Sequence, residues 1–306
     1  MHNRMELRIL GCHSATPKPD EYPSSQALRV GNQWLLIDAG EGMQSQIRRY
    51  GIKFGRIKNI FISHLHGDHV YGLFGFLSTL RLLNRQTEMH LYGPPELKPL
   101  LDTVFKFTQV ELTYPLHFHE ISGNGLQKIL DDDKFTVYSF PLNHRIETHG
   151  FLVKEKPLPR NLDIDAIKQH PEIGVWAYHN LKAGKDFVKE NGEIIPNEQL
   201  TVPPSPSHSY AYCSDTKYTP GIVEYIHGVD VLYHEATFSD ADKDLAEKTY
   251  HSTARQAAQI AKDAKAGKLI IGHFSSRYRD LNVLLNEARE VFPDTELARE
   301  GKSITF

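Results

Sequence analysis

The segment His64-Leu65-His66-Gly67-Asp68-His69 directly follows the apolar run Ile60-Phe61-Ile62, whose β-branched and aromatic residues favour a strand. In an extended segment, side chains two positions apart point to the same side, so the first two histidines would share a face. The aspartate and the third histidine would lie in the turn that leads into a helix predicted over Tyr71–Leu83. Neutral imidazoles and a carboxylate are ligands that suit Zn²⁺. The segment therefore predicts a metal site at the end of a strand.

Three further candidate ligands occupy the same position relative to a strand, just past the end of an apolar run. They are His144 after Phe140-Pro141-Leu142, Asp215 after Tyr210-Ala211-Tyr212-Cys213, and His273 after Leu269-Ile270-Ile271-Gly272. In layered α/β proteins, functional sites assemble at the ends of strands. We therefore expect these three residues and the motif to form one site.

Seven candidate ligands exceed the four that a tetrahedral zinc ion takes. They suit two metal ions about 3.5–4 Å apart that share a bridging carboxylate and activate a water for hydrolysis. The expected division is His64, His66 and His144 on one metal, Asp68, His69 and His273 on the other, and Asp215 as the bridge. We expect two Zn²⁺ ions per subunit, with Mn²⁺ as an alternative that similar ligand sets accept.

The composition is that of an ordinary globular protein and excludes collagen-like and largely disordered chains. The 306 residues include 35 Lys and Arg against 38 Asp and Glu, a formal net charge of −3, which argues against coating of nucleic acid through bulk positive charge. The two cysteines exclude a disulfide framework and indicate a reducing compartment. The N-terminus shows no secretory signal, and no run of about 18 apolar residues exists. We expect a cytoplasmic protein without a membrane partner.

Short apolar runs alternate with helical patterns along the chain, including a helical pattern over Gly221–His227, and this mixture indicates an α/β layered domain that spans residues 1–306. Residues 156–208 interrupt the pattern, because prolines and polar residues dominate there and no strong period runs through them. Such a stretch is either a surface loop or an arm that contacts a partner.

Further motifs make the sequence resemble one branch of the metallo-β-lactamase superfamily. They are Asp38-Ala39-Gly40-Glu41-Gly42-Met43-Gln44, His69-Val70-Tyr71-Gly72-Leu73, His234-Glu235-Ala236-Thr237, Tyr250-His251-Ser252-Thr253 and Gly272-His273-Phe274-Ser275-Ser276-Arg277-Tyr278. Together with the ligand pattern, they resemble ribonuclease Z, the endonuclease that trims precursor tRNA at its 3′ end. The resemblance implies a four-layer αββα sandwich, a homodimer, and a flexible arm at 156–208 that grips the tRNA.

The resemblance also implies roles for residues that do not bind metal. His251 would be the general acid, because imidazole titrates near the working pH, and Glu235 would orient it. Asp68 would hold the attacking water as well as a metal. Taken alone, His251 is better explained as a neighbour of the helix cap at Ser252-Thr253 than as a catalytic residue.

Contacts with RNA need local positive charge. Ser275 and Arg277 are candidates to hold a phosphate or ribose near the metals, although Arg277 alone would equally suit a surface ion pair. Arg48 and Arg49 begin a basic stretch, 48–58, that is either a phosphate patch or a solvated helix end. In the arm, the candidates are Lys182 and Lys185.

One loop departs from the family's pattern. Where the loop after the first strand commonly reads Pro-x-Lys-x-Arg-Asn, this chain has Pro17-Lys18-Pro19-Asp20-Glu21-Tyr22, with acidic residues in place of basic ones.

Three functions remain open at this point. The first is a zinc-dependent endoribonuclease that cleaves precursor tRNA and leaves a 3′-hydroxyl on the tRNA. The second is a related binuclear metal hydrolase that acts on small esters or cyclic phosphodiesters. The third is an RNA-binding module whose site has become structural, and the complete ligand set argues against it.

Overall fold

The protein divides into two compact units, which are described separately. The computed structural model describes residues 5–306; one unit comprises residues 155–207, and the other comprises residues 5–154 together with 208–306. The larger unit contains every candidate ligand named above. Among the described helices, none has the length and apolar character that a membrane crossing requires.

Two mixed sheets form the centre of the larger unit. The first has the order β18 (Ser303–Thr305), β1 (Glu6–Gly11), β2 (Ser25–Val30), β3 (Gln33–Ile37), β4 (Ile57–Phe61), β5 (Met89–Gly93) and β6 (Leu116–Glu120). The second has the order β17 (Thr295–Leu297), β16 (Lys268–Gly272), β15 (Val231–Glu235), β14 (Ser209–Cys213), β9 (His149–Glu155), β8 (Phe135–Pro141) and β7 (Gln127–Asp131).

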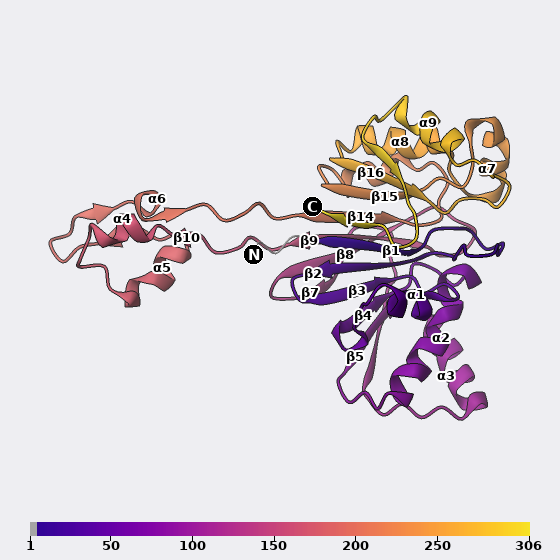
Figure 1. Cartoon of the computed structure of the whole chain (residues 1–306), viewed down its shortest axis with the longest axis horizontal. Helices are drawn as coiled ribbons and strands as arrows, with labels where there is room; N and C mark the ends of the chain where they lie inside the picture. The colour runs from indigo at the N-terminus through magenta and orange to yellow at the C-terminus, as the bar shows by residue number, and fades with distance from the viewer. Residues whose placement is uncertain (1–4) are drawn as a thin grey trace. The chain divides into compact units, whose positions relative to one another are not determined.

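Helices cover the outer face of each sheet (Figure 1). On the first sheet lie α1 (Met43–Arg49), α2 (Gly67–Leu82) and α3 (Leu97–Thr108); with the second sheet lie α7 (Lys243–Thr249), α8 (Ala254–Asp263) and α9 (Asn282–Arg289). Short 3₁₀ helices are η1 (Phe54–Arg56), η3 (Pro220–Glu224) and η4 (Asp240–Asp242). The predicted four-layer αββα sandwich is confirmed.

The alternation of side chains along β3 shows why the sheets are buried on both faces. Leu35 and Ile37 belong to the core shared with the second sheet, whereas Trp34 and Leu36 pack with the residues of α1 and α2. Successive side chains of a strand point to opposite faces, so the four consecutive apolar residues of β3 require cover on both faces. The ends of the strands are then the places where polar side chains can gather.

Two expectations about helices need correction. The helical pattern at Gly221–His227 is the 3₁₀ helix η3, which begins at Pro220. Helix α2 begins at Gly67, four residues before the predicted start, so Asp68 lies in its first turn. A carboxylate is favourable there because the positive end of the helix dipole faces it. The expected cap before α8 is confirmed, since Thr253 accepts a bond from the backbone N–H of Gln256 in a capping box.

Residues 155–207 form a small folded unit rather than the weakly structured stretch that the sequence suggested. Its elements are β10 (Asn161–Leu162), α4 (Ile164–Lys168), η2 (Val175–Ala177), α5 (Tyr178–Lys182), β11 (Phe187–Val188), β12 (Ile194–Ile195), α6 (Asn197–Leu200) and β13 (Thr201–Val202). A core of its own includes Ile167, Leu181, Phe187 and Leu200. Elements of two to five residues are too short to establish a hydrophobic period, which is why the pattern was not visible.

Candidate metal centre

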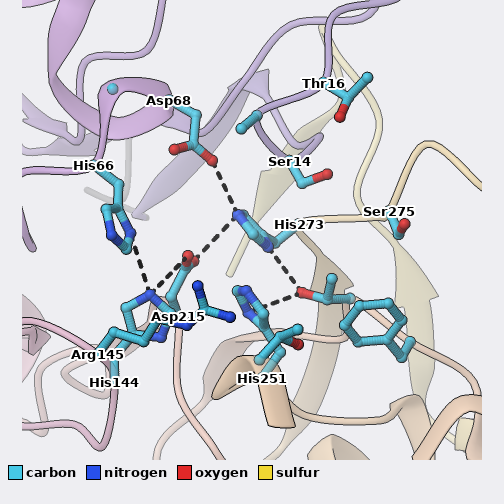
Figure 2. Close-up of a pocket in the computed structure, with 15 residues that line it drawn as sticks. Ser14, Thr16, His66, Asp68, His144, Arg145, Asp215, His251, His273 and Ser275 are labelled. Atoms are coloured by element: carbon cyan, nitrogen blue, oxygen red, sulfur yellow. Dashed lines mark hydrogen bonds and ion pairs between the residues drawn. The ribbon is translucent and has the colours of Figure 1, made fainter. Parts of the chain in front are cut away.

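The seven candidate ligands all lie just beyond strand ends or in the first turn of α2. The chain leaves β4 through Ile62 and Ser63, and His66 keeps an extended backbone immediately before α2. His144, Asp215 and His273 follow β8, β14 and β16. The structure brings all seven together in one place, and Figure 2 shows several of them around a shared pocket.

The first group of potential ligand atoms contains three imidazoles and one carboxylate. His66 Nδ1 lies 3.1 Å from His64 Nε2 and 3.2 Å from His144 Nε2. Asp215 Oδ2 lies 3.6 Å from His64 Nε2 and 3.8 Å from His144 Nε2. The side chains of His64, His144 and Asp215 are almost completely buried. The four atoms therefore converge on one small space.

The second group shares Asp215 with the first. Asp215 Oδ1 lies 3.3 Å from His69 Nε2 and 3.2 Å from His273 Nε2. Asp68 Oδ2 lies 3.3 Å from His273 Nε2 and 3.6 Å from His69 Nε2. Each carboxylate oxygen of Asp215 thus faces one of the two groups, which is the arrangement of a bridging ligand.

The imidazoles are held by bonds on the sides that face away from the two groups. The outward Nδ1 of His64 lies 3.0 Å from Ser63 Oγ, and that of His69 lies 2.8 Å from Asp38 Oδ2. The outward Nδ1 of His144 lies 2.8 Å from the Tyr250 carbonyl oxygen, and that of His273 lies 2.8 Å from Thr237 Oγ1. The inward atoms His69 Nε2 and Asp215 Oδ1 are buried and face each other at 3.3 Å, but neither makes a hydrogen bond of good geometry within residues 5–306. Buried polar atoms without partners are costly, so this donor set fits divalent cations.

The electrostatics of the centre favour neutral imidazoles at His64 and His144 and a negative charge at Asp215. Burial is the largest influence on His64 and His144 and lowers the pKa of both, which leaves neutral imidazoles with free lone pairs. Burial alone would raise the pKa of Asp215, but the adjacent His273 and His69 outweigh it and hold that pKa well below its usual range. Asp215 is therefore ionised in its buried position.

Asp38 stabilises the motif from behind. Its carboxylate accepts bonds from the Ser63 backbone N–H at 2.8 Å, the Ser63 hydroxyl at 2.8 Å and the Tyr212 hydroxyl at 2.7 Å, in addition to His69 Nδ1. The turn that carries Asp38 lies against α2, and a Cβ on Gly40 would come within 2.7 Å of the Asp68 carbonyl oxygen. Only glycine permits that approach.

Three residues at the centre adopt left-handed backbone conformations that cost energy for residues other than glycine. These are Asp38 with φ 55°, Tyr250 with φ 63° and His273 with φ 59°. Tyr250 presents its carbonyl to His144, Asp38 holds His69 Nδ1, and His273 is one of the seven candidate ligands. Strain of this kind persists where the surrounding structure imposes it and is concentrated at functional sites.

His251 and Glu235 form a pair beside the second group. His251 Nδ1 lies 2.8 Å from Glu235 Oε1, and the ring stacks on His273 with centroids 5.3 Å apart. Glu235 is fully buried and also accepts bonds from the backbone N–H groups of Thr216 and Thr237, each at 3.0 Å. His251 Nδ1 is thereby held by Glu235, and the side chain lines the pocket.

The pocket over the centre has a volume of about 620 Å³. Ser275 lines it, whereas Arg277 does not; its guanidinium lies 3.4 Å from Asp242 and over the Phe238 ring. Arg48 and Arg49 are exposed at the end of α1 and are not among the lining residues. Lys182 and Lys185 belong to the 155–207 unit.

Sequence reasoning missed several residues of the pocket, among them Arg145 and Thr237. Arg145 is exposed at its edge (Figure 2), and Thr237 supplies the hydroxyl that holds His273. Arg145 directly follows a predicted ligand, which was an available signal. Thr237 follows Glu235 by two positions, and nothing in that spacing points to His273.

Two sheets covered by helices, with histidines and aspartates gathered at strand ends, define a metal-dependent hydrolase of the metallo-β-lactamase class. Residues 199–274 match the family described as the β-lactamase superfamily domain, and residues 5–138 match the family described as anti-Pycsar protein Apyc1. At the level of the whole chain, the protein belongs to the ribonuclease Z family, as its relatives show.

The family assignment rests on similarity along nearly the full length. Ribonuclease Z of Bacteroides thetaiotaomicron is 46% identical over 303 residues, covering 99% of this chain and 96% of that protein. Ribonuclease Z of Cytophaga hutchinsonii is 46% identical over 299 residues, covering 97% of this chain and 95% of that protein. Among solved structures, the short form of human tRNase Z is 26% identical with a TM-score of 0.71, covering 98% of each chain. The predicted resemblance to this family is confirmed.

Proposed function

We propose that this enzyme is a zinc-dependent endoribonuclease that matures the 3′ ends of precursor tRNA and leaves a 3′-hydroxyl on the tRNA. The observation that carries the proposal is the convergence of seven ligands in two groups that share Asp215. The relatives named ribonuclease Z and tRNase Z support RNA as the substrate class.

The two groups would hold two Zn²⁺ ions per subunit, with Mn²⁺ as a substitute. His64, His66 and His144 would hold one ion, Asp68, His69 and His273 the other, and Asp215 both. Bound in this way, the ions lower the pKa of a water toward neutrality and neutralise the charge of the phosphodiester. The carboxylate of Asp68 would accept a hydrogen bond from the attacking water and orient it.

His251 would donate the proton that the leaving oxygen needs. Burial, the largest influence, lowers its pKa, but the carboxylates led by Glu235 outweigh burial and raise the pKa of His251 to about 9. The imidazole is therefore protonated at neutral pH, as a general acid must be before it acts. Arg145 and Ser275 line the pocket where they would contact the phosphate or ribose of the substrate.

The pH dependence tests this pair. Activity should fall as the pH rises and His251 loses its proton, with a basic limb in kcat no higher than about pH 9. Glu235→Gln removes the charge that raises this pKa, so the limb should move to lower pH by more than about one unit. A pH–rate profile of both proteins measures the shift. A basic limb at the same pH in both would contradict the assignment.

We further propose that the unit at 155–207 is an arm that binds the tRNA. It holds six Lys and Arg against eight Asp and Glu, so its net charge cannot attract RNA and single cations must do so. Lys189 lies within ion-pair distance of Glu193 and Glu172, and Lys168 of Asp165. Lys182 and Lys185 are exposed, make no ion pair within the described part of the chain, and remain available to phosphates.

Replacing both of these lysines with alanine should raise KM for precursor tRNA and leave kcat nearly unchanged. The salt dependence of binding should become weaker, by about one unit of slope for each lysine that no longer neutralises a phosphate. Lys168→Ala is the matched control, because that lysine is already paired with Asp165 at 2.8 Å. Steady-state kinetics at several salt concentrations decide the matter, and equal KM values in the double variant and the control would contradict the arm's role.

We propose that the protein is a cytoplasmic homodimer. Both cysteines are free and buried, which is consistent with a reducing compartment. Leu82 and Phe107 are 76% and 79% exposed near the ends of α2 and α3, and exposed apolar side chains of this size favour a covered interface.

The decisive experiment is incubation with a 3′-extended precursor tRNA, with and without an encoded CCA, followed by mapping of the product ends. The proposal expects one internal cut and a 3′-hydroxyl on the tRNA, with activity lost after metal removal and regained with Zn²⁺ or Mn²⁺. A small phosphodiester assayed in parallel tests the alternative of a small-molecule hydrolase. Cleavage of the small diester without cleavage of the tRNA would overturn the proposal.

A further inference from the structure

A second cluster of metal-ligating side chains lies in the larger unit, outside the seven residues of the centre. It contains Cys12 and His13, which follow β1, and Glu300, which lies between β17 and β18. One potential ligand atom of each lies within 4.8 Å of the others. Cys12 is completely buried and forms no disulfide, and the side chains of His13 and Glu300 are 11% and 18% exposed.

Carboxylates face both ring nitrogens of His13. Glu21 Oε2 lies 3.1 Å from Nδ1, and Glu300 Oε1 lies 3.6 Å from Nε2. A neutral imidazole carries only one N–H and can donate to only one of these oxygens. The shorter distance favours Glu21 as the acceptor, so Nε2 presents its lone pair to a carboxylate oxygen and to the neighbouring thiol. Glu300 Oε1 also accepts a hydrogen bond from the backbone N–H of Tyr22 at 3.2 Å, and the Cys12 thiol donates to the Glu300 carboxylate. A metal ion that bound here would displace the thiol proton, and the three side chains offer it a sulfur, a nitrogen and an oxygen as ligands.

We propose that Cys12, His13 and Glu300 form a third metal site, which takes a Zn²⁺ ion and in which Glu21 holds the imidazole. Zinc at about 2.0–2.1 Å from a nitrogen and about 2.0–2.2 Å from an oxygen separates these two atoms by roughly 3.4 Å in tetrahedral geometry. The distance of 3.6 Å between His13 Nε2 and Glu300 Oε1 is close to that value. A carboxylate bonded to the far nitrogen of a zinc-binding histidine is the usual support for such a ligand.

The site would fix a loop that borders the pocket of the metal centre. Cys12 and His13 begin the loop between β1 and β2, in which Ser14 and Thr16 line that pocket (Figure 2). The backbone of the loop is bonded to Phe274, the neighbour of His273, by Phe274 N to Cys12 O and Ser14 N to Phe274 O, each 3.2 Å. A Zn²⁺ ion joining the loop to Glu300 would make the pocket wall rigid without taking part in hydrolysis.

The presence of a cysteine makes the proposal testable apart from the function of the centre. A thiolate bound to Co²⁺ gives a sulfur-to-metal charge-transfer absorption, and the seven residues of the centre include no cysteine. Metal-stripped full-length protein is titrated with Co²⁺ and followed by absorbance. We expect the thiolate band to reach the intensity of one bound ion per chain, to disappear in Cys12→Ser, and to persist in Cys213→Ser, which replaces the other buried cysteine.

Two further measurements separate loss of the site from loss of the fold. The visible absorption of Co²⁺ bound to the histidine-rich centre should remain in Cys12→Ser, and the zinc content after dialysis against Zn²⁺ should fall by one ion per chain. His13→Gln keeps the thiol but removes one ligand. The Co²⁺ affinity measured from the thiolate band should therefore fall by tenfold or more. The proposal is overturned if the wild-type protein fills the centre without a thiolate band, or if the band survives in Cys12→Ser.

Discussion

Asp215→Asn is expected to reduce hydrolysis of the phosphodiester by more than about 10³-fold, the largest effect of any single substitution in this protein. Each of its carboxylate oxygens faces one group of ligands, at 3.3 Å from His69 Nε2 and 3.6 Å from His64 Nε2. The neutral amide offers one oxygen and one N–H₂ group, so it cannot bridge two cations. Two ions held by these groups would lower the pKa of a bound water by up to about nine units, so a variant that cannot hold them should lose this activation.

Metal analysis and single-turnover kinetics measure this result together. Glu147→Gln is the matched control, because Glu147 lies in the same loop as His144, is 45% exposed at its side chain and does not line the pocket. It should keep both metal content and rate. An Asp215→Asn variant that binds two ions and hydrolyses at the wild-type rate would exclude Asp215 as the bridge. Added metal is not expected to restore activity.

Asp38→Asn should lower the metal affinity of the second group by about 10–100-fold, which is the usual effect of losing a carboxylate that supports a ligating histidine. Asp38 touches no inward-facing atom of the centre; it acts by holding His69 Nδ1 at 2.8 Å. The amide N–H₂ of the asparagine would face the donors of Ser63 and Tyr212, so at least one of their hydrogen bonds would be lost inside the protein. The free energy of unfolding should therefore fall by about 1–3 kcal/mol.

The two aspartates should therefore respond differently to added metal. Activity of Asp38→Asn should recover at high Zn²⁺ or Mn²⁺, because its seven ligands remain. Tyr212→Phe removes one of the bonds to Asp38 but keeps the charge and the contact with His69, so it should retain nearly wild-type affinity. Metal titration by calorimetry compares the three proteins. Unchanged affinity in Asp38→Asn would show that His69 needs no such support.

The sequence alone was sufficient to predict the class of fold and the candidate ligands. A strand can be predicted from a few neighbouring residues, and the position of a histidine or aspartate at the end of that strand follows directly, because both are local properties of the chain. The pairing of His251 with Glu235 was accessible only through the resemblance to a family; their distance of 2.8 Å is a tertiary contact.

What the sequence could not show depends on sheet register and packing between distant segments. Thr237 holds His273 across 36 positions, and the Tyr212 hydroxyl reaches Asp38 across 174 positions. The short elements of the 155–207 unit cohere through a core assembled from side chains scattered along it.

By itself, the sequence determined the αββα sandwich, the seven candidate ligands and the family to which the chain belongs. Only the tertiary structure decided which oxygen of Asp215 faces which group, that Arg145 borders the pocket while Arg277 turns to Asp242, and that Glu300 meets Cys12. The reason is physical: hydrophobic periodicity specifies which face of an element is buried, whereas the meeting of two side chains requires both faces and the register between them to be fixed at once.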